Sequence, residues 1–218
     1  MDRLRLYDYA GSANCYKVRL LLAQLGLDYE RVPIDIFAGD TLTAEYAAIN
    51  PARTTPVLEV GDGEYLPESN AILLHLAEGT EMLPGDRFQR AQVYRWLLFE
   101  QADVVATMGG LRFRLATGRL RADDPGAERR RRGALETLKL LDEHLRDRAF
   151  MVGERYGVAD IALYGYVHVA HEADLEIDRY PAVQAWIERV AATPGYVNDL
   201  APYPPNAAAG AGRSIYDR

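Results

Sequence analysis

Cysteine is the scarcest chemistry-bearing residue in this 218-residue chain, which holds only one, Cys15. A single thiol excludes an intrachain disulfide framework and any cysteine-rich zinc site. Histidine is nearly as scarce: His168 and His171 lie three apart with Glu172 beside them, but no second cluster accompanies them. We therefore expect no metal, and a solvated or interface role for these residues.

Long apolar runs are also missing, and so is an excess of positive charge. No stretch is long and apolar enough to cross a membrane, and the first five residues do not resemble the start of a signal peptide. The formal net charge of −7 argues against general nucleic-acid binding. The arginine run at 129–132 does not change this, because its members point in different directions on a helix. The sequence predicts a cytoplasmic protein with no membrane or nucleic-acid partner.

Short strands and helices alternate in residues 1–79. Leu4 and Leu6 indicate a first strand, and a helix with Val18, Leu21, Leu22 and Leu25 on one stripe follows it and stops at Gly26. The remaining expected elements are a strand at 29–36, a helix at 41–49, strands at 57–60 and 64–66 joined at Gly61-Asp62-Gly63, and a helix at 68–77. This order predicts a four-stranded mixed sheet with helices on its faces.

After a linker at 80–86, the strand pattern disappears and an all-helical domain is expected over 87–200. Its expected helices cover about 87–120, 126–148, 157–173 and 180–193. Gly109 and Gly110 should bend the first of them, and Gly157 with Asp160 should form a half-made capping box. The tail at 201–218 is rich in Pro, Ala and Gly, so we expect it to be extended or partly disordered.

Two features of the first domain suggest a binding site. Pro56 stands directly before a strand, and a cis Thr55–Pro56 bond would leave backbone groups to which an extended peptide can add. The free N–H groups at the start of the Glu68-Ser69 helix form a site for a carboxylate. An extended peptide with a free carboxylate fits both features.

The whole chain resembles the cytosolic glutathione transferases. Three motifs carry the resemblance: Ser12 to Val18 is similar to the active-site turn of the serine-using classes, Thr55-Pro56-Val57 to the cis-proline loop, and Pro67 to Ile72 to the site for the γ-glutamyl group of glutathione. Gly157 to Ala162 further resembles the folding box of the family's sixth helix. The resemblance implies an α/β plus all-α fold, with a thioredoxin-like N-terminal domain and a C-terminal helical bundle.

A family member must stabilise the thiolate of bound glutathione. Ser12 lies between the first strand and the first helix, where a hydroxyl donor and the helix dipole both reach the sulfur. Asn14 is a second donor in similar bacterial proteins. Cys15 is a rival as the working thiol, but the family's reactive cysteine stands at the front of the turn, where this chain has Ser12, so the favoured interpretation of Cys15 is a small packed residue in the first turn of the helix. Tyr9 is a rival because other classes use a tyrosine at the end of the first strand, but the Ser12 pattern favours a structural or cleft-wall role for it.

The resemblance assigns the rest of glutathione as follows. Ser69 holds the γ-glutamyl carboxylate, Glu68 the ammonium group, and Thr55, Pro56 and Val57 the cysteinyl backbone. Arg53 or Lys17 meets the glycyl carboxylate, with a solvated surface charge as an equal alternative for either. A small apolar second substrate is expected between the domains, with Tyr9, Trp96, Phe99, Met108 and Phe113 as candidate wall residues; the alternative is that most of them are core.

The implied activity is that of a glutathione transferase, with glutathione as co-substrate and an electrophile or disulfide as second substrate. Glutathione-dependent disulfide reductase, peroxidase or isomerase activity is one alternative. A non-catalytic binding or regulatory module is the other, since a fold does not fix a function. A homodimer is also implied, formed by Arg87, Arg90 and Tyr94 of one chain and the helix at 71–78 of the other.

Overall fold

The computed structural model describes residues 4–61 and 63–217, which divide into two compact units. The first unit contains the residues up to Leu76 together with the tail from Val197 onward, and the second runs from Ala77 to Tyr196. Within the described residues, no helix is both long and apolar enough to pass through a membrane. Asp62 of the expected hairpin turn lies outside the described residues.

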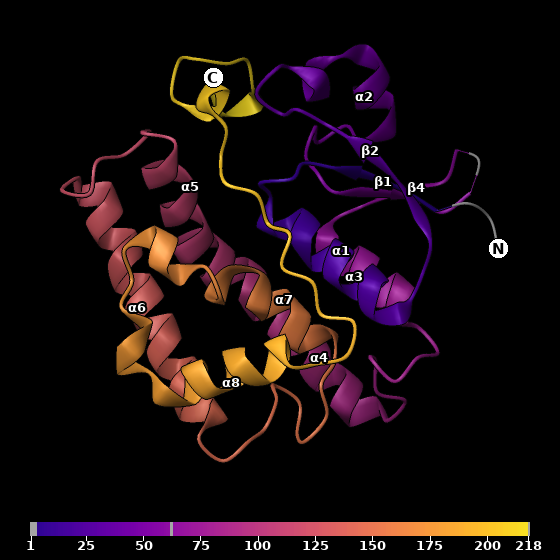
Figure 1. Ribbon diagram of the computed structural model, residues 1–218, viewed down its shortest axis with the longest axis vertical. Helices are drawn as coiled ribbons and strands as arrows, with labels where there is room; N and C mark the ends of the chain where they lie inside the picture. Colours follow the sequence, from indigo (N-terminus) through magenta and orange to yellow (C-terminus); the bar gives the residue numbers. More distant parts are fainter. Residues whose placement is uncertain (1–3, 62, 218) are drawn as a thin grey trace. The chain divides into compact units, whose positions relative to one another are not determined.

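The first unit has the thioredoxin-like arrangement predicted from the sequence. Its elements follow in the order β1 (Leu4–Asp8), α1 (Ala13–Leu25), β2 (Tyr29–Pro33), α2 (Ala44–Ile49), β3 (Val57–Glu59), β4 (Tyr65–Pro67) and α3 (Ser69–Ala77). The sheet order is β2-β1-β3-β4, with β1 and β2 parallel and the other pairs antiparallel. In Figure 1 the strands lie between α2 on one side and α1 with α3 on the other.

The core of this unit forms because α1 and α3 bury apolar side chains on the sheet. The buried residues of this layer include Leu6, Val18, Leu21, Leu22, Leu58, Ile72 and Leu73, each with no exposed surface. Tyr7, Tyr46 and Val57 form a second buried cluster. Gly26 ends α1 in the left-handed conformation (φ 63°), as its position after the apolar stripe predicted.

The tail is hydrogen-bonded to the first unit; residues 197–204 have no helix or strand, in keeping with the expected extended form, and these bonds hold the segment in place. The Tyr16 hydroxyl donates to the Val197 carbonyl at 2.8 Å, and the Ala201 N–H donates to the Ala10 carbonyl at 3.1 Å. Further on, the Asn206 amide donates to the Asp35 carboxylate at 2.9 Å. Figure 1 shows the tail in yellow running along α1 toward the α2 side of the sheet. Its Pro, Ala and Gly content allows close backbone contact with the neighbouring chain instead of disorder.

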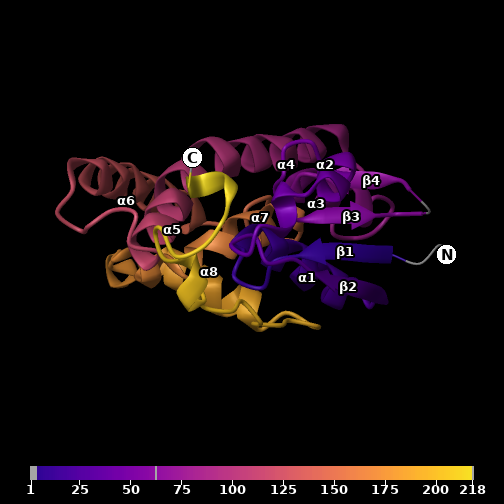
Figure 2. The same ribbon diagram turned by 90° about the horizontal axis from the view of Figure 1, so that it is seen from above.

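The second unit is helical, as predicted. Its helices are α4 (Arg87–Phe99), α5 (Gly110–Ala116), α6 (Pro125–Leu145), α7 (Val158–Val167) and α8 (Pro181–Ala191), with 3₁₀ turns at Ala170–Ala173 and Ile177–Arg179. Asp86 caps α4 by accepting from the Gln89 N–H at 2.9 Å. Figure 2 shows α4 running on as one long helix.

A π-helical segment, Glu100–Gly109, interrupts the α-helix that the sequence predicted over 87–120. Gly109 and Gly110 keep helical dihedral angles, so a bend at these glycines is not what interrupts it. The glycine at 109 instead leaves room for Tyr166 of α7, because a Cβ there would lie 2.6 Å from the Tyr166 ring. Gly133 of α6 likewise leaves room for Thr107, because a Cβ at position 133 would lie 2.7 Å from Thr107 Cγ2. Glycine therefore sets the close approach of both neighbouring helices to the π-helical segment.

The capping box at the start of α7 forms as predicted. The Asp160 carboxylate accepts from the N–H of Gly157 at 3.1 Å, from the N–H of Met151 at 2.9 Å and from the Trp186 indole at 2.8 Å. Burial raises the pKa of Asp160 to about 6, and these three donors oppose that shift. Gly157 replaces the usual Ser or Thr because a Cβ there would lie 2.7 Å from the Met82 carbonyl oxygen.

Candidate active site

The turn between β1 and α1 presents Ser12 at the N-terminus of a 13-residue helix. Ser12 has extended dihedral angles (φ −84°, ψ 120°), and its Oγ accepts from the Cys15 N–H at 3.3 Å. A serine hydroxyl that accepts in this way still has its own proton to donate. The half-buried Ser12 is therefore a donor held beside the positive end of the α1 dipole.

The start of α1 and the start of α3 are joined directly by side chains. The hydroxyl of Ser69, a residue only 3% exposed, donates to Asn14 Oδ1 at 3.3 Å. One turn further along α1, the Lys17 ammonium donates to Asn70 Oδ1 at 3.2 Å. Because Asn14 uses its oxygen toward Ser69, its Nδ2 is the side that can donate to a ligand. Two helix N-termini and two amide side chains thus face one site.

The loop before β3 is held by side chains from its own flanks. The Asn50 amide and the Tyr46 hydroxyl both donate to the Thr54 carbonyl, at 3.0 and 2.8 Å. The Thr55–Pro56 bond is cis, which confirms the condition set by the sequence. Val57 follows as the first residue of β3, paired with Tyr7 and Pro67.

Glu68 has an unusual backbone conformation at the edge of this site. Its φ is 72°, in the left-handed region, where a non-glycine residue costs about 1 to 2 kcal/mol. Its carbonyl accepts the Ile72 N–H at 3.0 Å, so Glu68 occupies the cap position directly before α3. Its side chain is exposed. The strained cap places an exposed carboxylate next to the N–H groups of α3.

Cys15 is a packed thiol, as the more favoured of its two sequence interpretations predicted. It has no exposed surface, and the Tyr9 N–H donates to its sulfur at 3.4 Å. Burial, reinforced by the Asp8 carboxylate, raises the pKa of Cys15 to about 12. A buried thiol with a raised pKa forms little thiolate at neutral pH, which argues against Cys15 as the nucleophile. Tyr9, 6% exposed, packs edge-on against Phe37 with ring centroids 5.7 Å apart.

We predict that Cys15 resists labelling in the folded protein. Because this is the only cysteine, the total thiol signal reports on one site. At pH 8 a disulfide reagent such as DTNB should modify less than about a tenth of the chains in the native state and all of them in urea. Rapid stoichiometric labelling of the native protein would contradict the burial of this thiol and restore Cys15 as a catalytic candidate.

Other predicted site residues are engaged elsewhere. Arg53 Nη1 donates to the carbonyls of Thr41 and Thr43, at 2.9 and 3.1 Å, so this nitrogen is already committed and a role toward the glycyl carboxylate stays a prediction. Lys17 has no exposed surface, which excludes the solvated-charge alternative for it. Lys17 lies on the same face of α1 as Asn14, three residues earlier, and that spacing is the signal that relates it to the site.

The four candidate wall residues in the second unit are mostly core. Trp96 and Met108 are each 1% exposed, and Trp96 packs against His144 with ring centroids 4.6 Å apart. Phe99 packs edge-on against Trp96, at 5.4 Å, and Phe113 lies under the Arg119 guanidinium. Trp96 and Met108 therefore belong to the core of the second unit, as the alternative expected of an apolar stripe at helical spacing, and a substrate-lining role for any of the four stays a prediction.

The histidine cluster has a packing role. The His168 ring stacks on the Tyr164 ring at 4.5 Å, and burial lowers the pKa of His168 to about 4. Glu172 pairs with Arg112 at 2.7 Å. Across residues 4–61 and 63–217, no group of three or more His, Cys, Asp or Glu side chains is arranged to hold a metal.

Comparison with protein families matches both units of the chain. Residues 6–81 match "Glutathione S-transferase, N-terminal domain", and residues 104–194 match "Glutathione S-transferase, C-terminal domain". Both matches follow the order of the motifs identified in the sequence.

Similar proteins of known structure or activity cover nearly the full chain. A glutathione S-transferase from Pseudomonas fluorescens Pf-5 is 40% identical, with a TM-score of 0.87 over 91% of this chain and 99% of that one. A second structure from Pseudomonas fluorescens Pf-5, a glutathione transferase family member with two glutathione bound, is 29% identical, with a TM-score of 0.80 over 89% and 90%. The maleylacetoacetate isomerase of Rhizobium meliloti (strain 1021) is 33% identical over 85% of this chain and 90% of its own length.

Proposed function

Because the chain belongs to the glutathione S-transferase family, we propose that it is an enzyme that binds glutathione and transfers its thiolate to an electrophile. The observation that carries the proposal is the direct link between Asn14 on the first turn of α1 and Ser69 on the first turn of α3. This link brings the proposed thiolate donors and the proposed carboxylate site together. The bound glutathione of one similar protein supports the choice of ligand.

The thiolate is stabilised at the start of α1. Ser12 donates its hydroxyl proton to the sulfur while its oxygen keeps the cap bond to Cys15. Asn14 Nδ2 is the second donor, and the α1 dipole adds favourable interaction with negative charge. A charged sulfur that accepts these bonds has a lower pKa than a free thiol, so more of it is nucleophilic at neutral pH.

The γ-glutamyl group binds at the start of α3. Its carboxylate accepts from the free N–H groups of the first turn. On binding, the Ser69 hydroxyl turns its one proton from Asn14 Oδ1 to this carboxylate. The γ-glutamyl ammonium group pairs with the exposed Glu68 carboxylate, and the backbone of Val57 pairs with the cysteinyl part after the cis bond. The left-handed conformation of Glu68 fits this role, since strain of this kind collects at ligand sites.

Glutathione-dependent isomerisation and disulfide reduction are the alternatives within the same chemistry. The similarity to a maleylacetoacetate isomerase supports isomerisation as an alternative. A disulfide reductase working through this chain's own thiol is disfavoured by the burial of Cys15, so any disulfide reduction would run through the thiolate of glutathione itself. A non-catalytic binding module remains the alternative of a different class.

We expect glutathione binding to depend on Glu68 and Ser69. Calorimetric titration of the full chain should give saturable binding, and Glu68→Gln and Ser69→Ala should each weaken it about tenfold, because each removes a charge-assisted bond. Glu64→Gln is the matched control, an exposed glutamate just before β4 that should leave the affinity within about twofold. Equal losses in all three variants, or no binding by the wild type, would contradict the assigned site.

We also propose that the protein forms a homodimer through α4. Tyr94 and Leu98 lie four residues apart on one face of this helix and are 41% and 72% exposed. Side chains of this size rarely stay exposed on one face without a partner surface. Arg90, expected to reach the other chain, instead bonds to Glu78 of its own chain at 3.1 Å, so the apolar pair is the stronger candidate.

Leu98→Glu should convert the dimer to a monomer. The substitution places a charge in the proposed interface, while the high exposure of Leu98 means that little burial within the chain is lost. Sedimentation velocity at about micromolar concentration measures the change. Leu140→Glu on α6, where Leu140 is 42% exposed, is the control and should leave the assembly unchanged. A wild-type protein that sediments as a monomer would refute the proposal.

A further inference from the structure

A second positively charged site lies in the helical unit, unconnected with the residues proposed for glutathione. A groove of about 490 Å³ opens where the N-terminal half of α4 meets the end of α6 and the loop after it. Its chemistry-bearing lining residues are Phe88, Gln89, Gln92, Arg95, His144 and Arg148. The described part of the chain contributes no carboxylate to this lining, although the protein as a whole carries a net charge of −7.

The two arginines of the groove are held in place without being neutralised. Arg95 lies over the Trp96 ring, 4.2 Å from its centroid, and donates to Gln92 Oε1 at 2.9 Å. Arg148 Nη1 donates to the His144 carbonyl at 3.0 Å. None of the ion pairs between described residues includes either guanidinium, whereas Arg131 and Arg146 of the same α6 region both pair with carboxylates.

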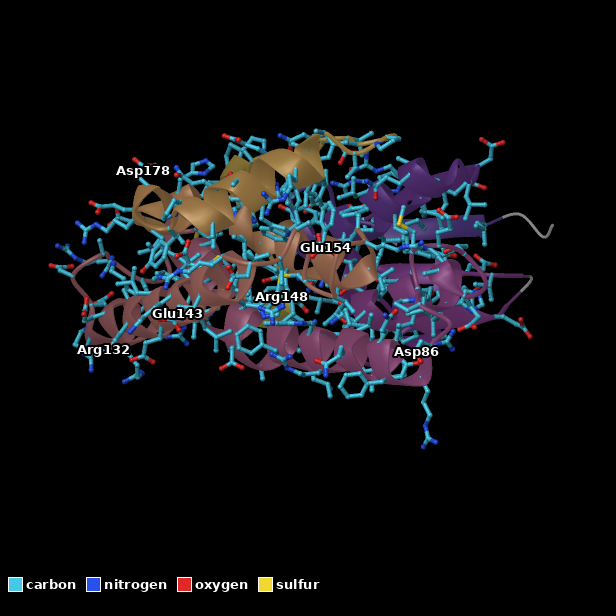
Figure 3. The ribbon with its side chains drawn as sticks, turned by 90° about the horizontal axis from the view of Figure 1, so that it is seen from below. Asp86, Arg132, Glu143, Arg148, Glu154 and Asp178 are labelled. Atoms are coloured by element: carbon cyan, nitrogen blue, oxygen red, sulfur yellow. The ribbon has the colours of Figure 1, made fainter. Side chains whose placement is uncertain are left out.

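The two arginines line the groove together with His144. The His144 imidazole bonds to the Met151 carbonyl at 3.0 Å and is half-buried between α4 and the loop. Burial lowers the pKa of His144, and the positive charges of Arg148 and Arg95 lower it further. In Figure 3 Arg148 lies beside α4, the labelled Glu143 and Asp86 lie to either side of it, and Glu154 is the labelled carboxylate that appears next to it in this view.

An aromatic ring completes the site. Phe88 lines the groove, and its side chain is 70% exposed. Its ring therefore offers an apolar surface that a ligand could cover. Guanidinium groups match phosphate, sulfonate and carboxylate groups in geometry as well as charge. The glutamines at the rim can donate to further oxygens.

We propose that this groove binds a small organic anion, with its phosphate, sulfonate or carboxylate group on Arg95 and Arg148 and its ring against Phe88. The site is separate from the proposed function, because none of its residues belongs to the α1 or α3 turns. The anion-binding residues are exposed and act partly through solvent, so the affinity is modest.

Phenyl phosphate is the test ligand, titrated into the full chain by calorimetry with glutathione present at saturation. Saturable binding is expected, and Arg95→Gln/Arg148→Gln should weaken it at least about tenfold. The matched control is Arg129→Gln/Arg132→Gln, which removes two exposed charges from α6 outside the groove and should change the affinity less than about twofold. Phe88→Ala should weaken phenyl phosphate severalfold and inorganic phosphate little.

Four results would overturn the proposal, three from titration and one from sedimentation. The first is no saturable binding by the wild type, and the second is an equal loss in both double variants, which would mean general charge attraction. The third is displacement of phenyl phosphate by glutathione, tested by repeating the titration at several glutathione concentrations, which would mean that it binds at the glutathione site. Sedimentation of Arg95→Gln/Arg148→Gln completes the design: a changed assembly with unchanged phenyl phosphate affinity would make the groove a contact between copies and would refute a ligand site.

Discussion

Ser12→Ala should lower kcat/KM toward an electrophile by about a hundredfold and raise the pKa of the bound glutathione thiol by about one to two units. The hydroxyl is the side chain nearest the start of α1 that can donate to the sulfur while its oxygen remains the helix cap. Without it, less thiolate is present at neutral pH. The thiolate is the reactive form, so the rise of the rate with pH should move to higher pH by the same one to two units. Ultraviolet thiolate absorbance of the bound ligand from pH 5 to 9 measures this without any choice of electrophile.

Two further substitutions separate the catalytic effect from the loss of a helix cap. Ser12→Ala also removes the bond from the Cys15 N–H, which costs about 1 kcal/mol of stability, whereas Ser12→Gly costs only a few tenths. Both should show the same raised thiol pKa if the hydroxyl acts on the sulfur. Ser12→Thr keeps the hydroxyl and the cap, and should keep most of the activity. An unchanged thiol pKa in the Ala and Gly variants would transfer the role to Asn14, and Asn14→Ala would then show the shift.

Much of this site was readable from the sequence because its signals are local. Ser12 stands between a period-two strand pattern and a helical stripe, so its place at the helix start needed only the residues around it. Pro56 before a strand and Glu68-Ser69 before a helix are signals of the same kind. What the local pattern could not provide is which of these ends face each other. The Asn14–Ser69 bond joins residues 55 positions apart, and no sequence prediction named it, although the resemblance to a family assigned both residues to one glutathione site.

Two features of the second unit could not be predicted from its local sequence, and both have the same physical cause. The aromatic and apolar stripe containing Trp96 and Met108 has helical spacing, and such a stripe has the same appearance whether it faces a ligand or another helix. The π-helical segment at 100–109 has no local signature in the sequence. Its close contacts with α7 and α6 occur at Gly109, which faces Tyr166, and at Gly133, which faces Thr107. The role of Gly109 as a point of close approach therefore required the packed structure.

The attachment of the tail depends on a buried arginine, Arg19, that the sequence analysis did not single out. Arg19 of α1 is 1% exposed, yet it bonds to the Asp8 carboxylate at 2.6 Å and to both oxygens of Asp199 in the tail at 2.9 Å. Its Nη2 also donates to the carbonyls of Ala10 and Asp199, both at 3.3 Å. Asp199 lies 180 residues away in the sequence, beyond the reach of any window analysis. One guanidinium therefore fastens β1, the active-site turn and the tail together.

Replacement of this arginine should have the largest effect on stability of the changes considered for the first unit. We expect Arg19→Met to reduce the free energy of unfolding in urea by about 3 kcal/mol, because it leaves the fully buried Asp8 carboxylate with less compensation. Arg31→Met is the matched control: Arg31 pairs with the same Asp8 carboxylate but is 40% exposed and does not touch the tail, so it should cost about 1 kcal/mol or less. Hydrogen exchange separates the two roles of Arg19. Amides of residues 197–217 should exchange faster in Arg19→Met and at the wild-type rate in Arg31→Met, because only Arg19 anchors the tail. Equal protection of the tail in both variants would show that the backbone bond from Ala201 to Ala10 holds the tail by itself, and the arginine would then serve only to compensate Asp8.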